Sequence, residues 1–364
     1  MGNLNNKKKN IKKKENNKEN NIQNNSQNTE NILNSEFSYI YFLKDLTTQS
    51  FCKYWNDNTF TLFKSYYDII YLIYTNKSNS IISLDLISNK KINEIKHAHN
   101  DYITSFRHYF DKNSKRDLLI SLSRDDNNLK LWNINSLECL FNIQKVNKVG
   151  FLTSACFLED NNSIYIITSN KKNNILIENI KIFDLNGNKI KEIKDSNNST
   201  VFIDTYYDIK LSKNFIITGN EGFSQSYDYN KNKKYFKYIE KENDNPHMSI
   251  IIDDKEKIIN MIESSCDGII RIWDFHSAKL LRKIYINYDW LYSICLWNKD
   301  YLFVGCRDSS IKLIKLNENK IIKNLKGHTN KVLTIKKIYL PKYGECLISQ
   351  DADNSQIKLW KISK

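Results

Sequence analysis

The nine residues Asp267–Phe275 read Asp-Gly-Ile-Ile-Arg-Ile-Trp-Asp-Phe, and the interpretation of the whole chain begins from them. The Asp267-Gly268 pair predicts a tight turn, because Gly accepts a positive φ and Asp can bond its own backbone. The β-branched and aromatic residues that follow contain no Pro and no helical period, so they predict a strand. A single turn and strand does not identify a fold, so the interpretation depends on whether this unit recurs along the chain.

The same unit recurs along the chain at a nearly constant interval. Each copy closes on an apolar strand that ends in a large residue, often followed by Asp or Asn. The closing residues are Leu84, Trp132, Phe183, Tyr227, Trp273, Ile314 and Trp360. They are separated by 48, 51, 44, 46, 41 and 46 residues, which gives seven units of about 46 residues. Short strand-like runs with polar connectors fill each unit, so the chain is predicted to be an all-β repeat protein.

Units of this length that end in Trp-Asp, carry Asp-Gly before the last strand and open with Gly-His resemble WD-repeat β-propellers. The clearest opening is Gly327-His328, where the His precedes Trp360 by 32 residues. In a second unit, Ala98-His99 stands in the same place, and its His precedes Trp132 by 33 residues. The resemblance implies a seven-bladed β-propeller of four-stranded antiparallel blades over residues 37–364.

The resemblance also implies which residues hold each blade together. In the family, a His, a Ser or Thr, an Asp and the Trp of one unit form a hydrogen-bonded network, since a buried indole N–H needs a partner. Carried over, the expected framework residues are His99, Trp132, Ser265, Asp267, Trp273, Asp308, His328, Ser349 and Trp360. The network of the second unit is expected to include Ser123 with Asp125 or Asp126, and that of the seventh Asp351 or Asp353. The fifth unit shows no clear His at its opening.

The chain ends in the third strand of the seventh unit, so the fourth strand of that blade must come from the N-terminal side. Phe51–Trp55 is the expected closing strand, with Tyr39–Leu43 as the alternative. Phe60–Lys64 is then the innermost strand of the first blade. Closure of this kind removes a free sheet edge and buries both faces of every sheet.

Residues 1–36 form a separate region that is rich in Asn and Lys. They contain almost no apolar residue and are expected to be disordered, because they cannot offset the entropy cost of ordering. Gly2 with Asn6 is a partial match to a myristoylation signal, and the Lys clusters of this tail supply the polybasic segment that a single acyl chain needs for membrane binding. A nuclear import signal and a merely solubilising tail are the alternative interpretations.

The composition limits the function classes. The net charge of +14 and pI of about 9.2 raise nucleic acid or an anionic membrane as partners, but the Lys residues are spread along the chain, which disfavours nucleic acid. The seven Cys form no Cys-x-x-Cys pair, no glycine-rich phosphate loop is present, and no secretory or membrane-spanning segment is apparent. We therefore expect an intracellular, mainly cytoplasmic non-enzyme without metal or cofactor, with nuclear or membrane-peripheral location as alternatives.

The expected binding residues precede the inner strands, where the family presents its top face. Alignment of the units selects Tyr102, Phe151, Trp290 and Lys331, and Arg124 and Arg307 stand just before turn acids. Aromatic and Arg residues on one face are typical of protein interfaces, although the aromatics could instead pack between blades. The sequence thus favours a scaffold that binds a protein or peptide through one face. A basic propeller that binds nucleic acid or an anionic membrane is the alternative.

Overall fold

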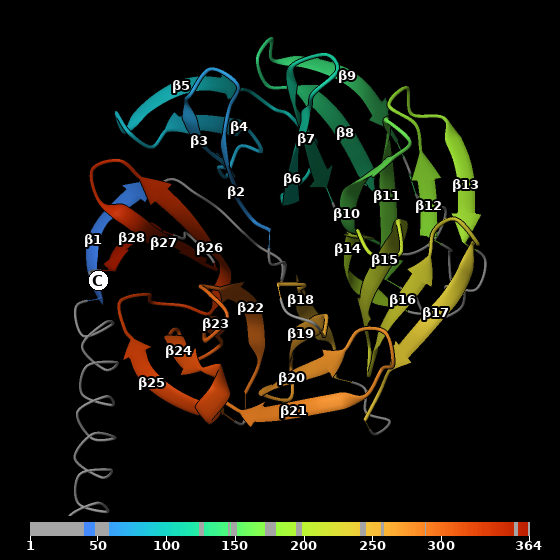
Figure 1. Cartoon of the computed structure of the whole chain (residues 1–364). Coiled ribbons are helices and arrows are strands. Elements are labelled where there is room, and N and C mark those ends of the chain that lie inside the picture. Colours follow the sequence, from blue (N-terminus) through green and yellow to red (C-terminus); the bar gives the residue numbers. More distant parts are fainter. Residues whose placement is uncertain are drawn as a thin grey trace, which may run out of the picture.

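The ring of seven β-sheets in Figure 1 is the seven-bladed propeller that the repeat predicts. The computed structural model describes residues 40–47, 58–123, 127–144, 146, 151–171, 180–193, 199–240, 245–255, 258–287, 289–352 and 356–362. Every blade is a four-stranded antiparallel sheet. The predicted tail of residues 1–36, with Gly2, lies outside the described residues.

The strands follow one another in chain order within each of blades 1 to 6. Blade 1 consists of β2 (Thr61–Lys64), β3 (Ile70–Thr75), β4 (Ile81–Asp85) and β5 (Lys90–Ile95). Blade 2 consists of β6 (Ile103–Asp111), β7 (Arg116–Ser123), β8 (Asn128–Asn133) and β9 (Glu138–Ile143). Blade 3 consists of β10 (Phe151–Asp160), β11 (Ser163–Lys171), β12 (Ile180–Phe183) and β13 (Lys189–Ile193). Blade 4 consists of β14 (Thr200–Asp208), β15 (Lys213–Asn220), β16 (Ser224–Asp228) and β17 (Lys233–Tyr238). Blade 5 consists of β18 (His247–Asp253), β19 (Asn260–Ser265), β20 (Ile269–Asp274) and β21 (Leu280–Tyr285). Blade 6 consists of β22 (Leu291–Leu296), β23 (Tyr301–Cys306), β24 (Ile311–Lys315) and β25 (Lys320–Leu325). A short 3-10 helix, η1 (Leu316–Glu318), follows β24.

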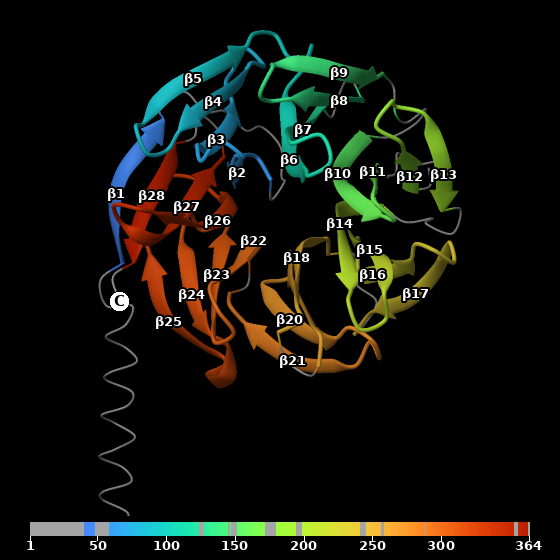
Figure 2. The same cartoon turned by 45° about the horizontal axis from the view of Figure 1, so that its top comes forward.

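The first strand of each blade stands next to the centre of the ring, and the fourth forms its circumference (Figures 1 and 2). We call the end where the innermost strand begins the top face. Because the strands alternate in direction, the turns between second and third strands also lie at the top. The turns between first and second strands, and between third and fourth strands, lie at the bottom.

Blade 7 is closed by the N-terminal side of the chain, as predicted, but by a different strand from the first choice. It consists of β26 (Val332–Leu340), β27 (Gly344–Asp351) and β28 (Ile357–Ile362), and β1 (Ile40–Thr47) completes it. β1 pairs antiparallel with β28 from Ile40 opposite Ile362 to Thr47 opposite Ile357. The closing strand therefore overlaps the alternative, Tyr39–Leu43, whereas Phe51–Trp55 lies outside the described residues.

Both faces of each blade are buried against the neighbouring blades. In β23, Tyr301 and Phe303 pack against blade 7, whereas Leu302 and Val304 pack against blade 5. This alternation follows the two-residue period of a strand. Seven apolar clusters of this kind occupy the seven interfaces between adjacent blades. The second and third strands are accordingly buried along almost their whole length, whether their residues are apolar, as in β3, or polar, as in β16.

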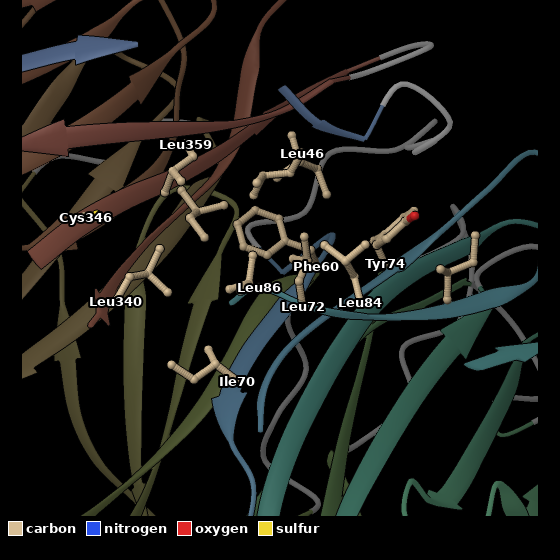
Figure 3. Packing of buried hydrophobic residues seen from close by; sticks show 13 residues of the cluster. Leu46, Phe60, Ile70, Leu72, Tyr74, Leu84, Leu86, Leu340, Cys346 and Leu359 are labelled. Carbon is tan, nitrogen blue, oxygen red and sulfur yellow. The ribbon is translucent and has the colours of Figure 1, made fainter. Parts of the chain in front are cut away.

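The interface between blades 7 and 1 joins the two ends of the propeller (Figure 3). Leu46 of β1 and Phe60, just before β2, belong to one cluster with Leu340 and Leu359 of blade 7. Phe60 is fully buried, and Leu46 is 6% exposed. The closing strand thus contributes side-chain packing as well as backbone hydrogen bonds.

Removal of the closing strand is expected to destabilise the propeller, whereas removal of the tail is not. A fragment of residues 37–364 should melt cooperatively at a temperature close to that of the full chain. A fragment of residues 48–364 exposes the edge of β28 and loses the buried Leu46, so it should melt at a clearly lower temperature or be recovered as insoluble protein. Differential scanning calorimetry on the two fragments measures the difference, and equal melting temperatures would contradict closure by β1.

Candidate functional site

The framework of blade 7 is a chain of buried hydrogen bonds between three side chains. His328 Nε2 lies 2.6 Å from Ser349 Oγ, and Trp360 Nε1 donates to the same hydroxyl at 2.7 Å. Asp351 accepts from the backbone N–H groups of Thr329 and Asn330 at 3.1 and 3.3 Å. The network joins the second and third strands to the connection that enters the blade. Asp353, the other acid considered for this blade, lies outside the described residues.

Blade 2 contains the same network with a different serine from the one expected. His99 Nε2 lies 2.7 Å from Ser121 Oγ, and Trp132 Nε1 donates to this hydroxyl at 2.8 Å. Ser123 stands two residues further along β7, and residues at this spacing point to the same face of a strand. Sequence spacing therefore could not separate the two serines. Asp125 and Asp126 lie outside the described residues.

In blade 5 a buried carboxylate stands where the other two blades have a serine. Trp273 Nε1 donates to Glu263 Oε1 at 2.8 Å, and His247 Nδ1 lies 3.0 Å from Glu263 Oε2. Ser265, the predicted framework residue, instead donates to the carbonyl of Pro246 at 3.3 Å. His247 is the first residue of β18 itself, only 26 residues before Trp273, whereas His99 and His328 stand before their innermost strands, so the repeat spacing did not reveal it.

The three acceptors occupy equivalent positions in the pairing of the second and third strands of blades 2, 5 and 7. Ser121, Glu263 and Ser349 lie directly opposite Lys130, Arg271 and Lys358, each two residues before the Trp of its blade. The register of the hairpin, which the structure supplies, thus identifies all three framework acceptors.

The electrostatics of the Glu263 carboxyl are set by opposing effects. Complete burial alone would raise its pKa, but the charge of His247 and hydrogen bonds from His247, Ser224 and Trp273 outweigh burial and hold the pKa below its usual range. In blade 2 the corresponding position is neutral. Burial, with a further contribution from Lys130, lowers the pKa of His99 to about 3. The two blades thus use a charged and an uncharged version of one network.

The turn acids of blades 5 and 6 hold a basic residue of the following strand. Arg271 donates through Nη1 to Asp267 Oδ1 at 3.2 Å, and Lys312 Nζ donates to Asp308 Oδ2 at 2.6 Å. The side chains of Arg271 and Lys312 are 4% and 9% exposed. These acids therefore compensate buried cations rather than bind a histidine.

The serine, histidine and aspartate of blade 7 resemble a hydrolase triad, since His328 faces Ser349 Oγ with Nε2 and lies 3.2 Å from Asp351 Oδ2 with Nδ1, but substrate cannot reach them. Ser349 is fully buried, and its hydroxyl already accepts the Trp360 indole N–H. The thiols provide no alternative nucleophile in the interior. Burial raises the pKa of Cys306 to about 12 and those of Cys295 and Cys346 to about 11, so they stay protonated at neutral pH.

Three of the predicted binding residues share one local structure at the top face. Tyr102, Trp290 and Lys331 each precede an innermost strand by one residue. The N–H of each donates to the side chain of the residue before it: Asp101 at 2.6 Å, Asp289 at 2.8 Å and Asn330 at 2.8 Å. The side chains of Tyr102, Trp290 and Lys331 are all half-buried. The shared turn explains why alignment of the units found equivalent positions in blades 2, 6 and 7.

Trp290 is the centre of a mixed aromatic and charged group in blade 6. The Arg307 guanidinium lies 5.3 Å from the centroid of the Trp290 ring, and its Nη1 is 3.2 Å from Asp289 Oδ1. The Arg307 side chain is 54% exposed. The Trp290 ring also meets Tyr292 edge to face, with centroids 6.0 Å apart. The structure therefore brings Trp290 and Arg307 together, as the top-face hypothesis requires.

Arg124 lies outside the described residues. The backbone of Phe151 begins β10 and pairs with Lys171, which places it at the top of blade 3.

The sequence did not predict an apolar cluster beneath this face. The ladders of β14, β18, β22 and β26 each shift register at the second residue. The residues at these bulges, Val201, Met248, Tyr292 and Leu333, pack together with Trp290. A β-bulge redirects one side chain out of the regular alternation. The signal was present as an apolar residue at the same offset in four consecutive units.

The described residues offer neither a metal cluster nor a membrane helix. No group of three or more His, Cys, Asp or Glu side chains among them could hold a metal ion. His97 is exposed in a turn whereas His99 is buried, so this pair does not form a common set of ligands. None of their helices has the length and hydropathy needed to span a bilayer.

Comparison with known proteins gives a partial similarity. No model of a protein family matches the chain. A stretch of 117 residues is 24% identical to the U3 small nucleolar RNA-associated protein 21 homolog of Schizosaccharomyces pombe. The match covers 32% of this chain and 12% of that protein, so the chain spans a small part of the length of this relative.

Substitutions of two tryptophans should separate framework from binding face. Trp360→Phe removes the indole donor to Ser349 and leaves a cavity, and should lower the free energy of unfolding by about 2–4 kcal/mol. Trp290→Phe retains most of the half-buried ring contacts and should cost less than about 1 kcal/mol. Urea unfolding monitored by circular dichroism measures both values. Equal losses would show that Trp290 is also a framework residue.

The lowered pKa of Glu263 predicts a dependence of stability on pH. A carboxyl with a depressed native pKa contributes stability above its unfolded pKa of about 4.5, and this contribution is lost as the pH falls through the native value. Glu263→Gln should cost about 1.5–3 kcal/mol at pH 7, because it replaces a buried carboxylate that accepts charge-assisted hydrogen bonds from Trp273 and Ser224. The difference from wild type should shrink below pH 4. Glu345→Gln, which removes a more exposed partner of Lys337, is the control and should have little effect. A deficit that stays constant down to pH 3 would contradict the ionised state of Glu263.

Proposed function

We propose that the protein is a non-enzymatic WD-repeat scaffold that binds a protein or peptide through the top face of its propeller. The seven four-stranded blades and the His–Ser–Trp networks of blades 2 and 7 support the family assignment. The burial of Ser349 supports a structural role for the residues that otherwise resemble a catalytic triad.

The group of Trp290, Arg307 and Asp289 is the observation that carries the proposal. Its Trp is half-buried on an apolar cluster, so the ring is held in place before a partner arrives. Its Arg is stacked on that ring and more than half exposed. Fixed Trp, Tyr and Arg side chains dominate the binding energy of protein interfaces because little conformational entropy is lost on binding.

The charges of this face favour a partner segment that carries carboxylates. The Arg307 guanidinium is already held by Asp289, and its remaining N–H groups can bind a second carboxylate in bidentate geometry. Lys331, at the corresponding position of the adjacent blade 7, adds a second positive charge. Tyr102 of blade 2 supplies an aromatic contact further around the ring.

A second candidate function is the binding of RNA, which the name of the S. pombe relative favours. The outermost strands carry the Lys residues that such binding would use: Lys90, Lys91, Lys189, Lys191, Lys233, Lys234, Lys237, Lys320 and Lys323. These residues surround the circumference rather than one face, and Lys on exposed edges also prevents edge-to-edge aggregation. Phosphate contacts weaken steeply with salt through counterion release, which distinguishes this function from top-face peptide binding.

The same relative bears on location. Its name places it with a small nucleolar RNA, so we propose a nuclear rather than a cytoplasmic location for this chain. Membrane association through Gly2 and the Lys-rich tail remains a separate hypothesis.

Partner recruitment should depend on the aromatic residues of the top face. Trp290→Ala/Tyr102→Ala should reduce the labelling of its partners at least about tenfold, since dominant interface residues cost about 2 kcal/mol or more when truncated. Proximity labelling in the native host, followed by mass spectrometry, compares the variant with wild type. Arg307→Glu, at a more exposed position, should reduce the same partners with less effect on folding.

Tyr339→Ala is the matched control, because this tyrosine is 63% exposed at the bottom end of β26. It should leave the labelled set unchanged. Identical partner sets for wild type and both top-face variants would place the interface elsewhere.

A further inference from the structure

The exposed hydrophobic side chains of the described residues are concentrated on the bottom face. Eleven large hydrophobic residues are exposed, and ten of them lie at the bottom end of a strand or in a bottom turn. Tyr285, at the top end of β21, is the exception. The ten are Tyr66, Tyr67, Ile87, Ile190, Tyr207, Ile209, Leu211, Ile258, Leu281 and Tyr339. Concentrated exposed apolar surface is typical of interaction sites, whereas single scattered residues are not.

One part of this face is hollowed. A cleft of about 500 Å³ lies between blades 5 and 6, which is within the range of ligand-binding sites. Its apolar lining includes Ile262, Ile272 and Leu316, which are 2%, 6% and 5% exposed. Ile258 and Leu281, at 49% and 38%, are more exposed parts of the same lining. The neighbouring strands β21 and β24 can be followed in Figure 1.

The walls of this cleft carry charges of both signs. Asp253 ends β18 and Asp300 lies in the turn between β22 and β23, so both carboxylates belong to the inner hairpins of their blades. Arg282 belongs to the outermost strand of blade 5, where its Nη1 donates to the carbonyl of Leu316 at 2.8 Å. Lys299, exposed beside Asp300, supplies the second cation. Two carboxylates and two cations leave the lining without net charge.

We propose that this cleft is a second binding site, which takes a segment of a partner protein with one branched aliphatic side chain between residues of opposite charge. The aliphatic side chain packs on Ile262, Ile272 and Leu316, between Ile258 and Leu281. A basic residue of the segment meets Asp253 and Asp300 on the side nearer the centre of the ring, and an acidic residue meets Arg282 on the outer side. The site is independent of the proposed top-face interface.

The charges decide between this occupant and a polyanion. An RNA phosphate that approached Lys299 would also meet the adjacent Asp300, and like charges disfavour such a contact. A peptide of mixed charge pairs with both sets. The apolar lining makes no favourable contact with a charged phosphate, whereas burial of a Leu or Ile side chain against it is favourable. With one site on each face, the propeller could hold two partners at the same time.

Selection from a random twelve-residue peptide library displayed on phage, with the full chain as the target, tests the proposal. The enriched peptides should share one Leu or Ile with a Lys or Arg on one side and an Asp or Glu on the other. One of them, labelled with fluorescein, then serves as the probe in anisotropy titrations. Ile258→Ser and Asp300→Lys should each weaken its binding at least about tenfold.

Two control variants give the result its meaning. Ile190→Ser changes a residue with the same 49% exposure on the bottom face of blade 3, and should leave peptide binding unchanged. Trp290→Ala/Tyr102→Ala should also bind the peptide normally, so that failure of the top-face proposal leaves this one standing.

Three results would overturn the cleft as a peptide site. The first is enrichment of no peptide, and the second is equal enrichment on the Ile258→Ser protein. The third is displacement of the peptide by a single-stranded RNA of twenty nucleotides whose own binding is lost in Arg282→Glu.

Discussion

Burial of both faces of every blade is the constraint on which the structure depends. A four-stranded sheet with two apolar faces is unstable alone in water, and the ring solves this because each sheet covers its two neighbours. The alternating side chains of β23, which pack against blade 7 on one face and blade 5 on the other, show the principle in one strand. The same constraint requires β1, because this strand completes blade 7 and buries Leu46 in the interface with blade 1.

The buried polar networks follow from the same constraint. Where a blade places a tryptophan in the interface, its indole N–H must find an acceptor away from water. Blades 2 and 7 provide a serine hydroxyl, and blade 5 provides the Glu263 carboxylate, whose second oxygen lies 3.0 Å from His247 Nδ1. Blade 6 has Ile314 at this position and needs no such acceptor. The packing site is therefore constant, while its chemistry varies with the residue that fills it.

Residues at the ends of the strands are free from this constraint, and there the two faces differ. At the top, Trp290 is fixed from below by an apolar cluster and from the side by Arg307. At the bottom, exposed apolar side chains occur on several blades, and two of them, Ile258 and Leu281, line a cleft whose charges balance. A rigid ring with two unlike faces can hold two partners in a defined relation without moving itself. The scaffold function that we propose requires this property.

The sequence by itself determined the class of fold, the number of blades and the third strand of each, because strand period and repeat spacing are local features of the chain. It also indicated that the N-terminal side closes blade 7, and it located Tyr102, Trp290 and Lys331 in equivalent turns. Only the tertiary structure decided that Ser121 and Glu263 are the framework acceptors, since two residues on one face of a strand look alike until their neighbours are known. The cleft between blades 5 and 6 likewise exists only in three dimensions, because its walls come from turns and strands that no sequence period connects.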